Sequence, residues 1–547
     1  MLRSWIESLL GSTWEKLGLP PVLIEVHPPE RPEFGDFSTN LPLIGAKAAN
    51  LPPRQLAERL VAAIPDDAFS RVEIAGPGFI NLFLQPTVTH TALQEILQAK
   101  DRFGFSTIGA GKTLQVEFVS SNPTGPLTVG HGRQAVLGDV LASLYEALGY
   151  SVSREYYFND EGRQIDLLAE SLWVRHRELY GETHDIPEDG YRGEYLKDAA
   201  AQLEAQLKDT SNTPEFISFT NEAKDFYRRE AVQRMTTIIK EDLVKLGVEF
   251  DEWFSEKDLH QSGEVDTALQ KLRERDGTYE KEGAVWLKAE ENGGVKDSVL
   301  IRSDGRPTYL MVDIAYHINK YHRGFGRVID VQGTDHQVEQ SCVKAAMRIL
   351  GYPEDFLDYA VHQFVSIKEG EQIARMSTRA GRFILLHELV NELGRDVVRY
   401  FMVARKPESH LEFDMDLARA ESLDNPVYYI QYAHTRIASI FRKAQALTID
   451  PAKVDLSPLQ AKAELGLIKR LDRFPKVVEE AALEFAPHLL TDYALGLARA
   501  FHAYYTEHRV IGENESLMAA RLSLLSAVQT VFHRSLSILG MSAPEAM

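Results

Sequence analysis

Hydrophobic and polar positions along residues 114–148 change from one period to another. Leu114, Val116 and Phe118 alternate with polar residues, as in a half-buried β-strand. A segment rich in Pro and Gly follows at residues 120–126 and breaks any regular element. Apolar residues then recur every three or four positions from 137 to 148. The stretch therefore predicts a strand, a loop and a helix in that order.

Further strands extend this pattern into a sheet. A second strand is expected at residues 153–158, and a buried strand at 327–331, with the sheet resuming near residue 298 and a helix from 307. A strand, helix and strand of this length form a parallel sheet with a right-handed crossover. We therefore expect a Rossmann-like α/β domain whose ligands bind beyond the carboxyl ends of its strands. A polar cluster at 159–164 falls at such an end, and it also reads as a turn that caps the next helix.

The chain as a whole divides into four expected parts. Residues 1–85 predict a small α+β domain, in which two or three helices accompany a hairpin of strands at 71–75 and 79–84, and residues 86–111 predict a linker helix. Residues 112–419 hold the parallel sheet, with a charged, mostly helical insertion at about 170–300. Residues 420–547 predict an all-helical domain. The helices expected in the last part lie at 425–445, 461–482, 486–508 and 516–539.

Composition limits the compartment. The 547 residues are 44% hydrophobic, which is enough for large cores. The sole cysteine, Cys342, excludes an internal disulfide framework and fits a reducing compartment. No uninterrupted apolar run has the length of a membrane span, and the first 19 residues are amphipathic and carry acids, unlike a secretory or transit peptide. We expect a cytoplasmic protein without a membrane partner.

The net charge of −20 argues against general affinity for nucleic acids, because phosphates are neutralised by Lys and Arg. It leaves room for a structured RNA that contacts local basic patches. Composition alone therefore leans away from RNA.

The start of the helix after the loop carries candidate chemistry. A helix N-terminus presents free N–H groups and attracts phosphate. Gly130 allows close approach to the backbone, and His131 can donate a hydrogen bond to a phosphate oxygen. On its own, a turn with a surface histidine explains this pair equally well.

Two motifs resemble a known family. Residues 128–131 (TVGH) resemble the HIGH signature of class I aminoacyl-tRNA synthetases, and residues 117–123 (EFVSSNP) resemble the arginyl-tRNA synthetases among them. Thr128 replaces the first histidine of the signature, and its hydroxyl can bond to phosphate without carrying charge. The resemblance extends to residues 33–37 and 76–81 of the N-terminal domain, which in that family touches the tRNA elbow, and to the C-terminal anticodon-binding helices.

A second signature follows at residues 374–381 (ARMSTRAG), which resemble the KMSKS loop. Arg375 stands for its first lysine and adds a fork suited to phosphate, whereas Thr378 replaces the second lysine. Arg379 or Arg382 could supply the missing cation. An ordinary basic surface loop is the alternative reading of this motif on its own.

The resemblance implies arginyl-tRNA synthesis. Arginine and ATP would form arginyl-adenylate, and the arginyl group would then pass to tRNA(Arg). Neither step needs a protein nucleophile, because positioning and cations serve displacement at phosphorus. Mg²⁺ would arrive with ATP, and no Cys or His spacing indicates zinc. The matching catalytic and ATP-binding positions are Thr128, Gly130, His131, Arg375, Met376, Ser377 and Arg379.

Selection of arginine requires acceptors for a planar, charged guanidinium. By resemblance the guanidinium would bind Glu117 and Asp313, with Tyr309 lining the pocket; the last two share a helix face at i and i+4. Ser120 and Asn122, with Gln337 as a further candidate, would hold the head group of the amino acid. The alternative is that Glu117 lies at a solvated strand end and that Asp313 is an acid on a helix surface.

For tRNA, the aromatic and basic segment 425–436 supplies Tyr428, Tyr432 and Arg436, which could stack bases and pair phosphates. Helix packing by half-buried tyrosines is the alternative. We expect a monomer. Two other functions remain open from the sequence: a different enzyme of the same nucleotidyl-transfer fold, and a catalytically silent RNA-binding or regulatory relative, which Thr128 and Thr378 would favour.

Overall fold

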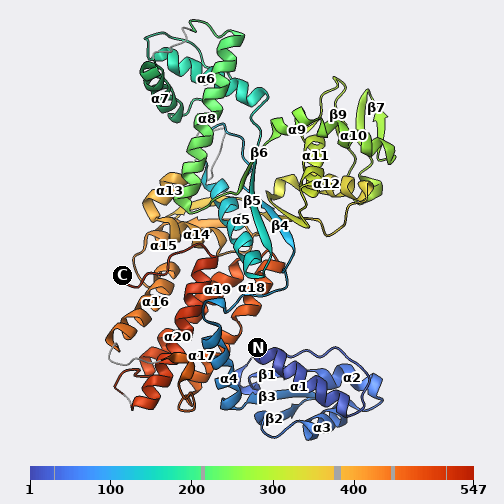
Figure 1. Ribbon diagram of the computed structural model, residues 1–547, viewed down its shortest axis with the longest axis vertical. Coiled ribbons are helices and arrows are strands. Elements are labelled where there is room, and N and C mark those ends of the chain that lie inside the picture. The colour runs from blue at the N-terminus through green and yellow to red at the C-terminus, as the bar shows by residue number, and fades with distance from the viewer. Residues whose placement is uncertain (30, 211–215, 375–383, 445–449, 513) are drawn as a thin grey trace.

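The computed structural model describes residues 1–29, 31–210, 216–374, 384–444, 450–512 and 514–547. Its elements form an elongated molecule with a central sheet, an N-terminal domain at one end and two lobes at the other (Figure 1). None of the helices in these ranges is both long and apolar enough to cross a membrane.

Five parallel strands form the central sheet, in the order β11-β10-β4-β5-β6. Their bounds are β4 Thr113–Glu117, β5 Ser151–Phe158, β6 Glu252–Ser255, β10 Arg327–Gly333 and β11 Leu357–His362. The order of the strands reverses between β4 and β10, so their carboxyl ends form the switch point at which such sheets bind ligands. This confirms the expected Rossmann-like sheet.

Helices pack against the strands of this sheet. α5 (Val129–Ala147) connects β4 to β5 and is buried along most of its length, while α11 (Tyr309–His322) and α12 (Gln337–Leu350) flank β10. β10 continues into the short η4 (Thr334–His336) before α12.

The segment expected as one insertion at 170–300 is divided. Helices α6 (Arg163–Glu178), α7 (Tyr195–Thr210) and α8 (Asn221–Leu246) form one lobe, with a core of their own. β6 then returns to the central sheet, so the insertion does not run uninterrupted. The second lobe holds α9 (Glu256–Ser262), α10 (Glu264–Glu274), η3 (Glu290–Asn292) and an antiparallel sheet of β7 (Thr278–Lys281), β8 (Ala284–Leu287) and β9 (Ser298–Ile301). β9, near which the central sheet was expected to resume, thus belongs to a different sheet.

The N-terminal domain contains α1 (Leu2–Lys16), α2 (Leu41–Ala49), α3 (Pro53–Ala63), and a sheet of β1 (Phe37–Thr39), β3 (Phe79–Leu84) and β2 (Phe69–Ala75). The hairpin was expected, whereas β1 was not, because it follows a Pro-rich segment with the short η1 (Pro32–Phe34). α4 (Pro86–Ala99) and η2 (Lys100–Arg102) lead to the central domain.

Beyond the central sheet, β12 (Val365–Glu369) pairs with β13 (Gln372–Ala374) and β14 (Leu411–Asp414), and α13 (Leu386–Leu393), α14 (Arg395–Val403) and α15 (Met415–Arg419) lead to the C-terminal helices. These are α16 (Pro426–Lys443), η6 (Pro451–Lys453), α17 (Lys462–Asp472), α18 (Phe474–Leu483), α19 (His488–Glu507) and α20 (Glu515–Ile538). The single helix expected at 461–482 is two helices, because Pro475 occupies the first turn of a new helix.

Candidate active site

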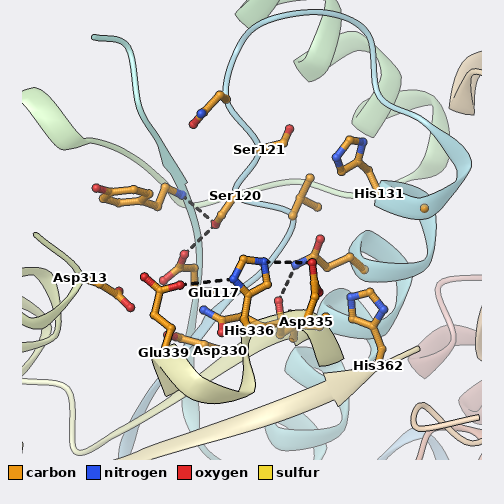
Figure 2. A pocket seen from close by; sticks show the side chains of 18 of the residues that line it. Glu117, Ser120, Ser121, His131, Asp313, Asp330, Asp335, His336, Glu339 and His362 are labelled. Carbon is orange, nitrogen blue, oxygen red and sulfur yellow. Dashed lines mark hydrogen bonds and ion pairs between the residues drawn. The ribbon is translucent and has the colours of Figure 1, made fainter. Parts of the chain in front are cut away.

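A cavity of about 950 Å³ opens at the carboxyl ends of β4 and β10 (Figure 2). It brings together strand ends, the loop after β4, the first turn of α5 and one face of α11. The described residues that line it are Glu117, Val119, Ser120, Ser121, Asn122, Thr128, Gly130, His131, Gln134, Tyr157, Asn159, Glu256, Tyr309, Asp313, Asp330, Val331, Gln332, Gly333, Asp335, His336, Glu339, His362, Gln363, Phe364 and Val365.

The loop after β4 is held in an unusual conformation. Val119 and Ser120 have φ angles of 68° and 42°, which β-branched and other non-glycine residues rarely adopt. The Ser120 hydroxyl donates to Glu117 Oε1 at 2.7 Å and accepts from the backbone N–H of Tyr157 at 3.2 Å. Ser121 is bonded to the hydroxyl of Tyr156. The hydrogen bonds to Tyr156 and Tyr157 on β5 stabilise the strained backbone and hold the loop at the cavity.

His131 is prepared to donate one hydrogen bond into the cavity. Thr128 is the N-cap residue of α5, and its backbone N–H donates to Nδ1 of His131 at 3.1 Å. Nδ1 is therefore an acceptor, and the proton of a neutral ring sits on Nε2. Burial lowers the pKa of His131 to about 4, with His362 adding to the effect. At neutral pH the ring is an uncharged donor, not a cation.

The segment after the second signature pairs directly with the first. The N–H of Val129 donates to the carbonyl of Ile384 at 3.2 Å, and the N–H of Leu386 donates to the carbonyl of Leu127 at 2.8 Å. Thr128 and Leu385 form an antiparallel bridge between these bonds. The chain thus leaves the second signature beside the start of α5. The predicted residues Arg375, Met376, Ser377, Thr378, Arg379 and Arg382 lie outside the described residues.

The two carboxylates expected to bind arginine line the same cavity. Asp313 lies on the far side from His131, and Glu117 lies between them (Figure 2). Tyr309, one turn before Asp313, is largely exposed at the cavity wall. Glu117 Oε2 also pairs with Lys320 at 2.5 Å. Burial raises the pKa of Glu117 to about 7, although Lys320 opposes the rise.

The head-group candidates are placed differently. Ser120 and Asn122 line the cavity, and the amide of Asn122 donates to Gln164 at 2.8 Å. Gln337 is the exposed first residue of α12 and is not among the described lining residues.

The structure also brings in residues that the sequence did not single out. Glu256 is buried at the cavity and accepts from the Tyr157 hydroxyl at 2.7 Å. His336 and His362 also line the cavity. The spacing of these residues in sequence carries no motif, although His336 belongs to the polar segment 332–337 at the carboxyl end of the strand expected at 327–331.

The charge of the lining is acidic in the described part of the chain. It contains six carboxylates and three histidines but neither lysine nor arginine. Any permanent cation for a triphosphate must therefore come from elsewhere, and the predicted Arg375 and Arg379 have the right chemistry. Within the described ranges, no group of three or more His, Cys, Asp and Glu side chains could hold a metal ion.

The residues expected to contact tRNA lie together on α16. The rings of Tyr428 and Tyr432 stack with centroids 6.3 Å apart, and Tyr432 also stacks on His502. The guanidinium of Arg436 lies over the ring of Tyr505 at 4.9 Å and is exposed. The tyrosines are half-buried, so their arrangement serves packing and still leaves ring surface open.

The parallel sheet with its cavity at the switch point and the Gly-His pair at the helix mouth agree with the expected catalytic domain of a class I aminoacyl-tRNA synthetase, and the family comparison shows that class. Residues 92–425 match the family "tRNA synthetases class I (R), catalytic domain", residues 4–84 match "Arginyl tRNA synthetase N terminal domain", and residues 430–547 match "DALR anticodon binding domain". The chain belongs to the arginyl-tRNA synthetase family.

Individual relatives agree along the whole chain. It is 46% identical to the arginine–tRNA ligase of Thermotoga maritima, with 100% of each chain covered, and 41% identical to that of Legionella pneumophila, with 96% and 95% covered. The solved structure of Thermus thermophilus arginyl-tRNA synthetase is 26% identical, with a TM-score of 0.77 and both chains covered completely. The activity of the protein is the ATP-dependent attachment of arginine to tRNA for translation. Neither a different enzyme of this fold nor a catalytically silent relative is therefore the correct reading.

Proposed function

We propose that the cavity activates arginine in a fixed orientation, with the side chain toward Asp313 and the carboxylate toward His131. The carboxylate attacks the α-phosphorus of ATP, pyrophosphate leaves, and arginyl-adenylate remains for transfer to tRNA(Arg). This orientation is supported by the position of Asp313 on the far side of the cavity from His131 at the helix mouth, with Glu117 between them (Figure 2).

Arginine is bound in this proposal by Glu117 and Asp313, with Tyr309 beside the guanidinium. Ser120 and Asn122 hold the head group, and Gln337 would reach it only if α12 or its side chain moved toward the cavity. Carboxylates suit a guanidinium because its planar donors form charge-assisted bonds that an uncharged side chain cannot replace.

The phosphates of ATP lie against Thr128, Gly130 and His131 in this proposal. Gly130 leaves open space at the helix mouth, because a Cβ built there meets only the Thr128 hydroxyl, at 3.7 Å. Nε2–H of His131 donates to a phosphate oxygen without adding charge. In this proposal Arg375 and Arg379 supply the positive charge for pyrophosphate as it leaves, and Met376 and Ser377 contribute uncharged contacts to ATP.

Mg²⁺ enters with ATP and neutralises phosphate charge when bound. The described residues offer no cage of three protein ligands, so phosphate oxygens and water would supply most of its coordination.

The remaining parts would serve tRNA. We assign residues 1–85 to the tRNA elbow, 86–111 to the linker, 112–419 to catalysis and 420–547 to the anticodon, where Tyr428, Tyr432 and Arg436 contact the RNA. We place this reaction in the cytoplasm and assign it to a monomer.

The observation that carries the proposal is the shared cavity of Glu117, Asp313 and His131. Glu117→Gln and Asp313→Asn keep the shape of each side chain and remove its charge. A hydrogen bond to a charged group is worth about 1.5–3 kcal/mol, so KM for arginine should rise roughly 10- to 150-fold in either variant. KM for ATP should change little, as measured by tRNA-dependent aminoacylation at varied arginine and ATP.

Asp258→Asn is the matched control, since Asp258 is an exposed acid on α9, two residues from the cavity. It should behave as the unchanged protein. Unaltered arginine kinetics in both cavity variants would refute the assignment of the two acids.

A further inference from the structure

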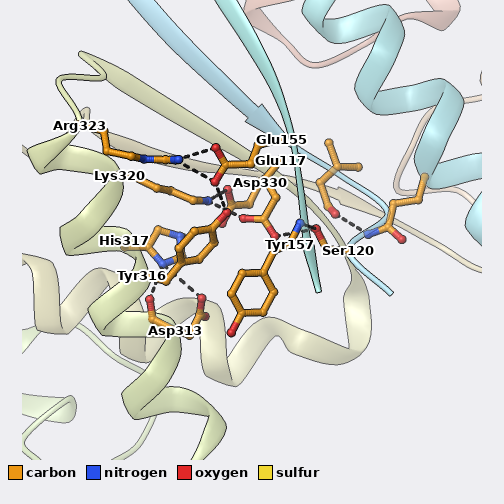
Figure 3. Close-up of polar contacts among 12 residues, drawn as sticks. Glu117, Ser120, Glu155, Tyr157, Asp313, Tyr316, His317, Lys320, Arg323 and Asp330 are labelled. Carbon is orange, nitrogen blue, oxygen red and sulfur yellow. Dashed lines mark hydrogen bonds and ion pairs between the residues drawn. The ribbon is translucent and has the colours of Figure 1, made fainter. Parts of the chain in front are cut away.

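A row of three carboxylates crosses the central sheet next to the cavity. Asp330, Glu117 and Glu155 occupy paired positions on β10, β4 and β5. All three side chains face α11 (Figure 3). α11 and its C-cap residue carry three basic side chains at intervals of three positions, His317, Lys320 and Arg323.

Each acid has a basic partner at short distance. Lys320 Nζ lies 2.5 Å from Glu117 Oε2 and 2.8 Å from Asp330 Oδ1. Arg323 forms the outer pair with Glu155, at 2.6 Å. This outer pair does not reach the cavity, because neither residue is part of its described lining.

His317 connects the row to Asp313. Its Nε2 lies 2.7 Å from Asp330 Oδ2, and its Nδ1 lies 2.8 Å from the backbone oxygen of Asp313 and 3.2 Å from Oδ1 of the same residue. Both ring nitrogens thus face acceptors, which requires a proton on each. The two carboxylates raise the pKa of this buried ring to about 10, against the effect of burial.

Glu117 and Asp313 are therefore the two ends of one continuous chain of ion pairs. Within that chain three carboxylates face two cations, Lys320 and the His317 imidazolium. One negative charge is left over, and one guanidinium would neutralise it.

We propose that Lys320 and His317 are positioning residues for arginine recognition, which keep Glu117 and Asp313 ionised and directed at the cavity. The inference rests on the proposed role of those two acids. It assigns the selectivity of the pocket for a single positive charge in part to Lys320 and His317, two buried cations that are not among the described lining residues.

The charge state of Glu117 is the quantity that Lys320 controls. Burial favours the neutral acid, and so does the neighbouring carboxylate Asp330 on β10. Glu155, the neighbouring carboxylate on β5, is paired with Arg323. The other titratable groups around Glu117 are Tyr316 on α11, Tyr157 on β5 and Tyr359 on β11, which are neutral acids. Lys320 is the cation in direct contact with it. Replacing Lys320 should therefore move the ionisation of Glu117 to higher pH.

The test is the pH profile of kcat/KM for arginine between pH 6 and 9, which reports ionisations of the free enzyme. In the unchanged protein kcat/KM should rise as Glu117 ionises, with a midpoint near its pKa of about 7. In Lys320→Met the midpoint should shift upward by at least one pH unit. KM for arginine at pH 7 should then rise at least about fivefold, because the ionised fraction of Glu117 falls from about one-half to about one-tenth. KM for ATP should remain within twofold. His317→Gln should raise KM for arginine at least fivefold, because Asp313 loses its partner.

Two control variants distinguish the loss of the Lys320 charge from a general disruption of the structure. Arg323→Met removes a comparable ion pair from the same row and should leave the midpoint in place. Glu117→Gln gives the baseline profile of the other groups, which include His336, whose pKa Glu339 raises. If Lys320→Met fails to fold, the double variant Lys320→Met/Asp330→Asn removes one charge of each sign, which costs less than leaving one unpaired. It should show a smaller upward shift, because the loss of Asp330 partly offsets the loss of Lys320.

An unmoved midpoint in the Lys320 variants, or equal changes in KM for arginine and ATP, would overturn this inference. If Glu117→Gln itself leaves arginine kinetics unchanged, the proposed role of Glu117 fails instead. If Glu117→Gln is strongly impaired and Lys320→Met is not, the acids bind arginine without help from the row.

Discussion

Two glycines in the first turn of α5 provide a sharp test of the phosphate site. A Cβ on Gly130 would meet no atom closer than the Thr128 hydroxyl, at 3.7 Å, so the fold itself has room for a methyl group. A Cβ on Gly132 would instead lie 2.7 Å from Cδ1 of Leu386. Gly130 faces the cavity, and Gly132 is buried. Alanine at position 130 therefore tests the phosphate site, and alanine at position 132 tests packing against Leu386.

The expected magnitudes follow from these distances. Gly130→Ala should not lower stability, because alanine in a helix is favoured over glycine by roughly 0.5–1 kcal/mol. If a phosphate occupies the space at the helix mouth, the methyl group should cost about 1.5–3 kcal/mol of ATP binding, as other overpacked contacts do. That corresponds to a loss of roughly 10- to 150-fold in kcat/KM for ATP. Gly132→Ala should cost about 1–3 kcal/mol in stability for the same steric reason, partly offset by the gain in helix propensity.

The assays are tRNA-dependent aminoacylation at varied ATP and thermal unfolding of each variant without ligand. The expected pattern is opposite in the two proteins: Gly130→Ala is stable and impaired toward ATP, while Gly132→Ala is less stable and keeps its KM for ATP. Normal ATP kinetics in a stable Gly130→Ala protein would show that no phosphate approaches this turn, and the orientation proposed for the substrates would have to be abandoned.

Two buried groups allow predictions about stability. Arg399 donates to Asp139 Oδ2 and to the carbonyls of Leu246, Gly247 and Leu539. Arg399→Met leaves these buried acceptors without their donor, although Arg154 still pairs with Asp139 Oδ1, and should cost about 3–5 kcal/mol. Calorimetry should show a lower unfolding temperature, and an unchanged temperature would contradict this. Gln115 is fully buried, and neither polar atom of its side-chain amide has a partner among the described residues. Gln115→Leu should therefore raise the free energy of unfolding by about 1 kcal/mol. A decrease would show that a buried water satisfies the amide.

Local patterns in the sequence predicted the elements that lie close together along the chain. The alternation ending at Phe118 and the helical spacing after residue 137 predicted β4 and α5, but the helix begins eight residues before that spacing is visible. Its first turn is Val129–His131, where glycine and polar residues hide the period. β6 and β1 were missed because each is only three or four residues long and gains its stability from a partner strand distant in sequence.

The chemistry of the site was predictable only where a motif marks it. Glu117, His131 and Asp313 could be named because each falls at a fixed place in or after a recognisable segment. Lys320, His317 and Glu256 could not, since their roles come from strand register and from the packing of α11 on the sheet. Asp, His, Lys and Arg at 313, 317, 320 and 323 are typical of a solvated charged helix face, but the structure buries His317 and Lys320.

The local backbone contacts explain how Thr128 can occupy the position at which the family signature has histidine. The position has two structural duties: its backbone N–H fixes the tautomer of His131, and its residue caps α5 while bridging to Leu385. Both use the backbone, and threonine is among the residues favoured at an N-cap. The substitution therefore removes one ring donor from the phosphate site without disturbing the donor on His131. Because the described lining of the cavity is acidic, the proposed ATP site would need the arginines of the second signature for its positive charge.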